Sequence, residues 1–375
     1  MMKCCENCFN DVDIKARIRN IAESGNCDFC HSKNVCTLDI EKTIFDKNYA
    51  ENIISDFEDL LNLYVVYDLD KSPELEKFDD ESHKLADHLF NNTNIFNLSS
   101  NKISKLLKKL LIRKYSENKE LFNSLVIPRY LLNEMLMKSS GIFKGDTWEN
   151  FEEDIKYNNR FHSTMTNEGI LMRFFEATTI ELKEGSEFYR ARISGDGSPI
   201  SSDHMGAAPS GVASPGRLNA SGIGYLYLCE RYDVAVAEIK SSLNDVCTVA
   251  KFKILSKLTL VDLSQISKLS IFQFDNKEQY LMNYEILNKL DDSMRRLSSN
   301  ERSEIGYVPT EYISDLIKYM TINGKRIDGI KYISTIDDET LDIVLFDENK
   351  AQQLKNELTS YQVRKINYTD LRKVQ

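Results

Sequence analysis

The pattern of apolar and polar residues changes twice along the chain. Residues 1–38 contain few apolar positions. Over residues 39–165, apolar residues recur at helical spacing, as in IEKTIFDKNYAENIISDFEDLLNLY and NKISKLLKKLLIRKY. From about residue 170, short runs rich in β-branched and aromatic residues are separated by turns, as in EFYRARI, GYLYL, CTVAKFKIL and LDIVLF. The pattern therefore predicts a short first region, a helical domain and a region of strands mixed with helices.

The strands of the last region do not alternate regularly with helices. Helical patterns interrupt them only in places, as in DVAVAEIKSSL and TEYISDLIKYMTIN, and Gly324 is the expected C-terminal cap of the second helix. Such a mixture is typical of an α+β domain and not of a doubly wound parallel sheet. We expect domains at 1–38, 39–165 and 166–355, followed by a C-terminal tail at 356–375.

Composition and charge narrow the classes of protein that need to be considered. A chain of 375 residues with 42% apolar residues can form two or three domains, each with its own core. Neither a signal peptide nor a run of about 18 apolar residues that could span a membrane is visible, so we expect a cytoplasmic protein without membrane contact. The net charge of −10 argues against nucleic acid as a partner. The basic stretch at 102–114 is interpreted as the solvated face of an amphipathic helix.

Six of the eight cysteines lie within the first 36 residues. Cys5 and Cys8 form one CxxC pair, and Cys27 and Cys30 form a second pair after 18 intervening residues. This spacing is typical of structural zinc sites, in which four protein ligands close a tetrahedral shell. Because cytosolic thiols stay reduced, the cluster favours a metal over disulfides. The sequence therefore predicts a structural zinc ion on these four residues.

The spacing leaves the ligand set open at two positions. Cys4 could replace Cys5, and either His31 or Cys36 could replace Cys30. A further alternative is that the thiols bind no metal.

A glycine-rich loop, SPGRLNASGIGYLYL at 214–228, leads into an aromatic strand. It lacks the Lys and Ser/Thr of a Walker A loop, and it precedes a strand and not the helix that follows GxGxxG. By itself it predicts only a turn, with Arg217 unexplained. In the earlier strand EFYRARI, alternation places Arg190 and Arg192 on one face together with Phe188. These arginines point either to solvent or into a cleft.

The helix expected after GYLYL carries Glu238 among the small or apolar residues Ala235, Ala237 and Ile239. Such a carboxylate lies either on the exposed side of the helix or in a pocket. The helix alone favours exposure, because ionised side chains are seldom buried.

In this order the motifs resemble the RES domain family, which is named for its Arg, Glu and Ser. The resemblance rests on YRAR, GRLN, YLYL with a glutamate 11 residues after its second tyrosine, and DGIKYIS followed by LDIVLF, and it covers about 180–350. It implies a fold similar to that of ADP-ribosyltransferase toxins. In addition, CCENCFND, GNCDFC and the helical segment after them resemble the zinc-binding HEPN-like extension of longer RES proteins.

The resemblance also implies an activity and a set of site residues. RES proteins consume NAD by hydrolysis or phosphorolysis of the nicotinamide–ribosyl bond, or transfer ADP-ribose to protein, and many are toxins restrained by an antitoxin. The implied catalytic residues are Arg190, Glu238 and Ser334. The implied substrate-binding residues are Tyr189, Arg217 and Tyr227.

These residue types suit the chemistry of NAD. The planar fork of arginine binds phosphate oxygens, and tyrosine can stack on the nicotinamide or adenine ring. A carboxylate stabilises the positive charge that grows on the ribose as the N-glycosidic bond breaks. Nicotinamide leaves from a cationic precursor and needs no general acid, so Glu238 alone can suffice. We expect Ser334 to hydrogen-bond the ribose or nicotinamide and not to attack, because no histidine lies near it in sequence.

Two other functions fit part of the sequence. A zinc-containing RNA-binding or RNA-cleaving factor would use the cysteine pairs and the basic stretch, although Arg160 and His162 are too close together for a HEPN ribonuclease motif. A non-catalytic nucleotide-binding module would use the glycine loop without turnover. We expect instead an NAD-consuming, toxin-like enzyme with structural zinc. Its expected partners are NAD, an antitoxin or regulatory protein, and a second copy of the chain.

Overall fold

The computed structural model describes residues 2–21, 23–46, 48–295, 304–322 and 324–365. The chain forms two compact units. The N-terminal unit consists of Met1–Thr147, Met165–Asn167 and Ser267–Leu287, and the C-terminal unit of Trp148–Thr164, Glu168–Ile266 and Asn288–Gln375.

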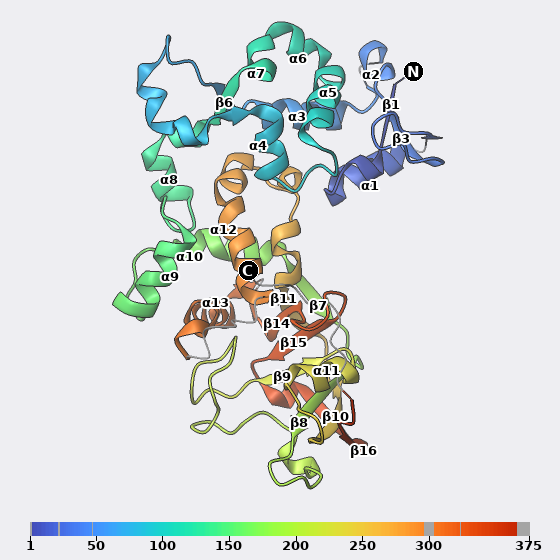
Figure 1. Ribbon diagram of the computed structural model, residues 1–375, viewed down its shortest axis with the longest axis vertical. Helices are drawn as coiled ribbons and strands as arrows, with labels where there is room; N and C mark the ends of the chain where they lie inside the picture. The colour runs from blue at the N-terminus through green and yellow to red at the C-terminus, as the bar shows by residue number, and fades with distance from the viewer. Residues whose placement is uncertain (1, 22, 47, 296–303, 323, 366–375) are drawn as a thin grey trace. The chain divides into compact units, whose positions relative to one another are not determined.

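The N-terminal unit is mainly helical, as the periodicity predicts (Figure 1). Its helices are α1 (Val12–Ile21), α2 (Lys42–Phe45), α3 (Glu51–Leu61), α4 (Leu85–Asn91), α5 (Ser100–Leu110), α6 (Ile112–Glu117), α7 (Lys119–Asn123), α8 (Glu134–Ser140) and the first part of α12 (Lys277–Arg295). Its strands are β1 (Lys3–Cys5), β2 (Ser24–Gly25), β3 (Val35–Asp39), β4 (Tyr64–Val66), β5 (His83–Lys84) and β6 (Leu125–Pro128). They form two antiparallel sheets of three strands each, in the orders β1–β3–β2 and β4–β6–β5. The second sheet lies within residues 39–165, which we expect to form a helical domain.

Helix α5 carries most of the basic stretch and is amphipathic, as predicted. Its apolar residues are buried, whereas its lysines lie on the outer face; the buried residues are Ile103, Leu106, Leu107 and Leu110. Lys102 donates a hydrogen bond to the carbonyl oxygen of Phe29 at 2.7 Å. One lysine of this face thus binds the loop that carries the second cysteine pair.

Aromatic rings from distant parts of the chain form the core of the N-terminal unit. The rings of Phe57 and Phe96 are 5.7 Å apart, and the ring of Phe272 contacts that of Phe57 edge-on at 5.2 Å. Phe272 belongs to the segment 267–287, which the sequence predicts as part of the C-terminal domain. The structure corrects that boundary, because this segment packs within the N-terminal unit.

The C-terminal unit contains a mixed sheet of eight strands in the order β16–β10–β8–β9–β15–β14–β11–β7. The strands are β7 (Thr179–Leu182), β8 (Glu187–Ile193), β9 (Leu226–Cys229), β10 (Val246–Ile254), β11 (Leu258–Asp262), β14 (Gly329–Ile333), β15 (Leu341–Leu345) and β16 (Ala351–Gln362). The helices are α9 (Trp148–Glu153), α10 (Glu168–Ala177), α11 (Tyr232–Glu238) and α13 (Val308–Tyr319), together with the end of α12. Strands β11 and β14 are parallel, and the other neighbouring strands are antiparallel. The predicted α+β class is confirmed.

Both faces of the sheet are covered around β8 and β9. One face carries a core that includes Phe188, Leu226 and Leu228. On the other face, α11 packs against β8, β9 and β10 through Val234 and Ala235 (Figure 1). Central strands of this kind can hold polar side chains in a protected environment under a helix.

Four residues on neighbouring strands lie in one row across the sheet. Tyr189 of β8 pairs with Cys229 of β9, Cys229 pairs with Asp342 of β15, and Asp342 pairs with Tyr332 of β14. Directly paired residues project from the same face of a sheet. This row forms the floor of the candidate site.

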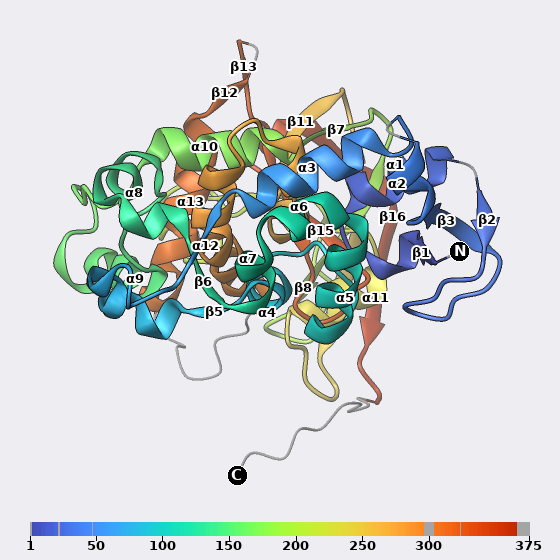
Figure 2. The same ribbon diagram turned by 90° about the horizontal axis from the view of Figure 1, so that it is seen from above.

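Two expectations about the end of the chain need correction. Strand β16 extends to Gln362, past residue 355 where we expect the domain to end, and residues 366–375 of the expected tail lie outside the described residues. Helix α13 ends at Tyr319, so Gly324 does not cap it. Gly324 has φ 77° and lies in the hairpin of β12 (Thr321–Ile322) and β13 (Lys325–Arg326), which projects from the unit (Figure 2).

None of the helices in the described part of the chain is long and apolar enough to cross a membrane.

Candidate functional site

A cavity of about 280 Å³ lies over the row of four residues. Helix α11 contributes Ala235, Glu238 and Ile239 to its wall. Strand residues complete the lining, and they include all members of the row together with Arg190, Ala191, Tyr227 and Leu228. The cavity thus combines ring faces, a carboxylate from a helix and a second carboxyl from a strand.

Glu238 is the last residue of α11 and lies at the cavity, not on the exposed side of the helix. Ala235, one helical turn earlier, is buried against the sheet, and residues three apart share a helix face. The side chain of Glu238 is therefore half-buried, although the helix taken alone favours exposure.

Ser334 follows β14 and fixes the carboxylate of Glu238. Its Oγ donates a hydrogen bond to Oε1 of Glu238 at 2.6 Å. Its own position is held by its backbone N–H, which donates to Thr340, and by the N–H of Ile336, which donates to Oγ. The hydroxyl group of Ser334 has one proton, and this proton points to Glu238. The sequence predicts instead that Ser334 donates its hydrogen bond to the substrate.

Tyr227 is hydrogen-bonded to Asn219 of the glycine-rich loop, a residue to which the sequence prediction assigns no role. Its hydroxyl donates to Oδ1 of Asn219 at 2.7 Å and accepts from the N–H of Leu218 at 3.2 Å. The amide of Asn219 donates in turn to the carbonyls of Ser214 and Ile223, each at 2.9 Å. The loop is thus organised around one buried asparagine.

The loop requires glycine at the point where it passes Tyr227. A Cβ atom on Gly216 would lie 2.6 Å from Oδ1 of Asn219 and 3.0 Å from the hydroxyl of Tyr227. Both distances are shorter than normal contacts, so a larger residue would displace this pair. The loop therefore uses this glycine to let its backbone approach the tyrosine closely.

Arg217 follows Gly216 and points toward the row. Its carbonyl oxygen accepts a hydrogen bond of 2.5 Å from Oγ1 of Thr310 on α13, and its guanidinium carbon lies 5.9 Å from the ring centre of Tyr332. Its Nε atom is buried and has no hydrogen-bond partner among the described residues. An N–H donor in this state is suited to an oxygen of a bound molecule.

Arg190 borders the cavity, but its side chain leaves β8 on the other face of the sheet. It pairs with Ala250, which belongs to the core on the face opposite α11. Its Nη1 donates to the backbone carbonyl of Tyr227 at 3.2 Å, and its Nε is buried without a partner in the described structure. Burial and then the nearby charge of Arg192 lower the pKa of Arg190 to about 10. The guanidinium of Arg190 thus contacts the backbone of Tyr227 from the face of the sheet opposite α11.

Asp342 is one of the site residues that the sequence prediction misses, together with Cys229 and Tyr332. It is 1% exposed, and neither of its carboxyl oxygens has a hydrogen-bond partner within the described ranges. Burial, followed by the neighbouring Glu238, raises the pKa of Asp342 to about 9. The sequence signal that could have identified Asp342 is its acidic side chain within the otherwise apolar strand LDIVLF.

The two CxxC pairs meet in the N-terminal unit. The Sγ atoms of Cys5, Cys8, Cys27 and Cys30 all lie within 4.8 Å of one another. The Cys5–Cys30 and Cys8–Cys27 distances are 3.3 Å, and the Cys5–Cys8 distance is 3.9 Å. Sulfur atoms around a tetrahedral zinc ion with bonds of about 2.3 Å lie about 3.8 Å apart. This cluster could therefore hold a metal ion.

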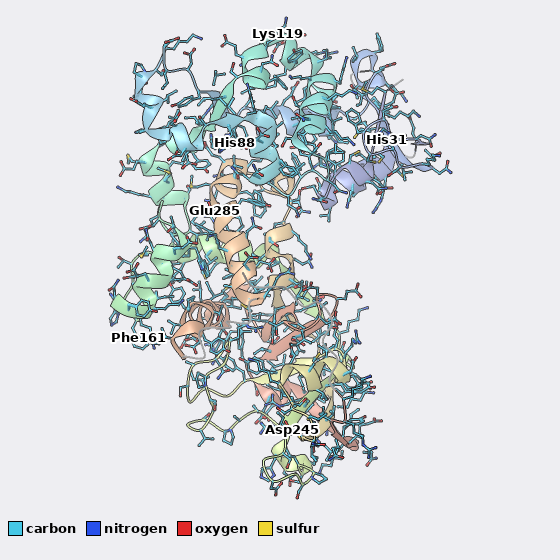
Figure 3. The ribbon with its side chains drawn as sticks, viewed as in Figure 1. His31, His88, Lys119, Phe161, Asp245 and Glu285 are labelled. Carbon is cyan, nitrogen blue, oxygen red and sulfur yellow. The ribbon has the colours of Figure 1, made fainter. Side chains whose placement is uncertain are left out.

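The alternative ligands are not among the four residues of this cluster, although Cys4 lies next to Cys8 and Cys27. The side chain of His31, labelled in Figure 3, is exposed, and the residue has φ 64°. Cys36 lies in β3, where it pairs with Ser24, and the Sγ of Cys4 contacts the carbonyl oxygen of Cys5 at 3.9 Å. Within the cluster, the Sγ of Cys27 accepts hydrogen bonds from the backbone N–H groups of Phe29 and Cys30, each at 3.4 Å.

Comparison with known proteins identifies the C-terminal part of the chain. No curated protein matches the chain. The family model of the RES domain matches residues 187–368, which include every strand that lines the cavity and helix α11. The match includes only the segment 267–287 of the N-terminal unit and not residues 1–147, whose HEPN-like nature stays a prediction. RES domains are generally NAD-related modules of toxin–antitoxin systems, and residues 187–368 of this chain form a RES domain.

Proposed function

We propose that this protein is a toxin-like enzyme that cleaves the nicotinamide–ribosyl bond of NAD in the cavity under α11. The observation that carries the proposal is the carboxylate of Glu238, which is held by Ser334 and faces a cavity walled by Tyr189, Tyr227 and Tyr332. In a RES domain, this combination of a fixed carboxylate and aromatic faces suits a cationic nicotinamide ribosyl group.

Glu238 is the proposed catalytic residue. As the N-glycosidic bond breaks, positive charge moves from the pyridinium ring to the ribose. A carboxylate beside the ribose stabilises that charge more strongly in the transition state than in the bound substrate. The hydrogen bond from Ser334 keeps the carboxylate in one orientation, so no reorganisation is needed during the reaction.

Arg217 is the proposed ligand of the pyrophosphate. The cavity of about 280 Å³ is too small for a whole dinucleotide and suits its nicotinamide riboside half. The rest of the nucleotide would leave the cavity along the glycine-rich loop, where the buried Nε of Arg217 offers an unused donor. Charge-assisted hydrogen bonds from arginine to phosphate are among the strong ones in proteins.

Arg190 has a different proposed role from the one that the resemblance implies. Its side chain holds the carbonyl of Tyr227 from the opposite face of the sheet. We therefore expect Arg190 to support the position of Tyr227, whose ring and that of Tyr189 would contact the nicotinamide or ribose.

The N-terminal unit is proposed to be a HEPN-like regulatory domain with a structural zinc ion on Cys5, Cys8, Cys27 and Cys30. The four thiols fit a closed tetrahedral shell, which leaves no position for a substrate. An antitoxin or regulatory protein would restrain the enzyme in the cytoplasm.

Incubation of the purified protein with NAD tests the proposal. Wild type is expected to release nicotinamide, and Glu238→Gln is expected to reduce the rate by about 100-fold or more, because it removes the stabilising charge. Glu184→Gln changes an exposed glutamate in the turn before β8 and should be fully active. Undiminished release in Glu238→Gln would contradict the assignment of the site.

The same incubation identifies the acceptor. Hydrolysis yields ADP-ribose, phosphorolysis yields ADP-ribose 1″-phosphate, and transfer yields a modified protein. Cleavage of RNA without loss of NAD would instead favour an RNA-cleaving factor.

A further inference from the structure

Asp342 is a second carboxyl group beside the proposed catalytic one, and both of its oxygen atoms are buried. It lies at the centre of the row, where its neighbours on β9 and β14 are Cys229 and Tyr332. Glu238 faces it from α11, and Arg217 approaches from the glycine-rich loop. Although Asp342 is 1% exposed, neither carboxyl oxygen accepts or donates a hydrogen bond within the described structure.

The two carboxyl groups are in unequal surroundings. Glu238 is half-buried and accepts a hydrogen bond of 2.6 Å from the hydroxyl of Ser334. Asp342 lies deeper, and its polar neighbours are Glu238 itself and the thiol of Cys229, which is only a weak hydrogen-bond donor. Two neighbouring carboxyl groups that are partly or wholly shielded from water cannot both ionise easily, so the proton remains on the more buried and less supported one. Burial and the proximity of Glu238 accordingly raise the pKa of Asp342 to about 9.

The other groups that face Asp342 do not compete for this proton near neutral pH. Burial raises the pKa of the Cys229 thiol, and Asp342 raises it further. Burial likewise raises the pKa of Tyr332 well above its ordinary value. Both groups therefore stay neutral, while Arg217 supplies a positive charge that limits the rise at Asp342.

We propose that Asp342 is protonated at neutral pH and donates its O–H to an oxygen atom of the nicotinamide riboside part of the substrate. Asp342 is thus a neutral substrate-binding residue and not a second catalytic carboxylate. This inference rests on the proposed function, because it assigns the cavity to NAD. It also explains how the site limits its negative charge. A second anion would stabilise the cationic nicotinamide ring of the bound substrate as well as the transition state, and would therefore add less to the rate than to binding.

Infrared spectroscopy tests the protonation without any substrate. The difference spectrum between wild type and Asp342→Asn at pH 7 is expected to show the carbonyl stretch of one protonated carboxylic acid. This band should disappear from wild type as the pH rises through about 9. Absence of the band at pH 7, or a band that persists in Asp342→Asn, would overturn the proposal.

Binding of an NAD analogue that cannot be cleaved, with a methylene group in place of the ribose ring oxygen, tests the contact with substrate. Asparagine keeps a neutral donor, so Asp342→Asn should bind within about threefold of wild type, whereas Asp342→Leu should bind about tenfold more weakly after losing one hydrogen bond. Wild-type affinity should fall above pH 9 and that of Asp342→Asn should not. Asp338→Asn, a change at an exposed position of the preceding turn, should behave as wild type.

The outcomes distinguish failure of the donor role from failure of the proposed function. If Asp342→Asn binds as weakly as Asp342→Leu while both variants unfold at temperatures near that of wild type, an ionised Asp342 is required and the proposal is wrong. If wild type shows the infrared band but does not bind the analogue, the protonation stands, whereas the assignment of the cavity to NAD and the donor role both fail.

Discussion

Ser334 donates a hydrogen bond of 2.6 Å to Glu238 and so joins the end of strand β14 to the end of helix α11. The two residues are 96 positions apart in the sequence. The bond fixes a carboxylate at the wall of the cavity, and its removal should affect the reaction more than the binding of substrate.

Ser334→Ala is expected to lower kcat for NAD cleavage by about 10- to 100-fold, which corresponds to about 1.5–3 kcal/mol for a hydrogen bond to a charged group. KM should change little, because the serine does not need to touch the substrate. Steady-state kinetics measure both constants, and Ser198→Ala at an exposed loop position serves as control. A raised KM with unchanged kcat would indicate instead that Ser334 binds the substrate directly.

Arg217→Ala is expected to weaken the binding of the uncleavable NAD analogue by about 1.5–3 kcal/mol, through the loss of charged hydrogen bonds to phosphate. Arg217→Lys should recover only part of this loss, because lysine lacks the planar fork. Titration calorimetry gives the affinities, with Arg326→Ala on the β12–β13 hairpin as control. Equal affinities for Arg217→Ala and wild type would exclude the pyrophosphate role.

Gly216→Ala should disrupt the contact between the glycine-rich loop and Tyr227. The new Cβ would lie 2.6 Å from Oδ1 of Asn219, so overpacking should cost about 1–3 kcal/mol of stability and displace the tyrosine. Gly195→Ala is the matched control, because a Cβ at that position would meet nothing within 4 Å beyond its chain neighbours. Thermal unfolding and NAD turnover are the measurements, and a fully active, equally stable Gly216→Ala would show that the loop tolerates the methyl group.

The cysteine cluster should contain about one equivalent of zinc, because four thiolates complete a tetrahedral shell. Metal analysis of the purified protein measures it, and Cys8→Ser should lose the metal and lower the unfolding temperature of the N-terminal unit. Cys4→Ser and Cys36→Ser should retain zinc, since neither residue belongs to the cluster. Less than about half an equivalent, with no loss of thermal stability on chelation, would argue against a structural metal.

The pKa of Asp342 also predicts how stability depends on pH. Its pKa is raised on folding from 3.8 to about 9, so the folded state keeps a proton that the unfolded chain releases. The stabilising contribution is therefore complete below the unfolded pKa and is lost as the pH rises toward 9. Asp342→Asn has no such loss. Its stability relative to wild type should increase between pH 4 and pH 9 by several kcal/mol, because each unit by which folding raises the pKa corresponds to about 1.4 kcal/mol. Thermal or urea unfolding at several pH values measures this difference, and parallel curves for the two proteins would contradict it.

The polar residues of the RES motifs could be identified from the sequence because they occur in a fixed order at turns and strand ends. Arg217 after Gly216 and Glu238 after Tyr227 are examples, and the same applies to the two CxxC pairs. The α+β class follows from local alternation and turn residues. All these signals are carried by short stretches of the chain.

The contacts missed by prediction depend on pairing between distant segments. Asp342 lies in an apolar strand, and only its register against Cys229 and Tyr332 brings it into the cavity. The residues next to Glu238 along its helix are the same whether its side chain is exposed or buried. Only the packing of α11 against the sheet determines that the side chain faces the cavity. Strand β4 continues a helical pattern, and its partner β6 lies about 60 residues later in the chain. No periodicity within either segment records that pairing.

The row of four residues that forms the floor of the cavity exists only when the strands pair in the correct register. The proposed activity therefore depends on that register. A slip of β15 by one residue would turn the carboxyl of Asp342 into the apolar core on the opposite face and present Leu341 or Ile343 to the cavity. During synthesis, the cavity cannot be completed until β15 has left the ribosome and inserted between β9 and β14. A nascent chain without β15, or a chain with β15 in the wrong register, would thus lack the proposed activity.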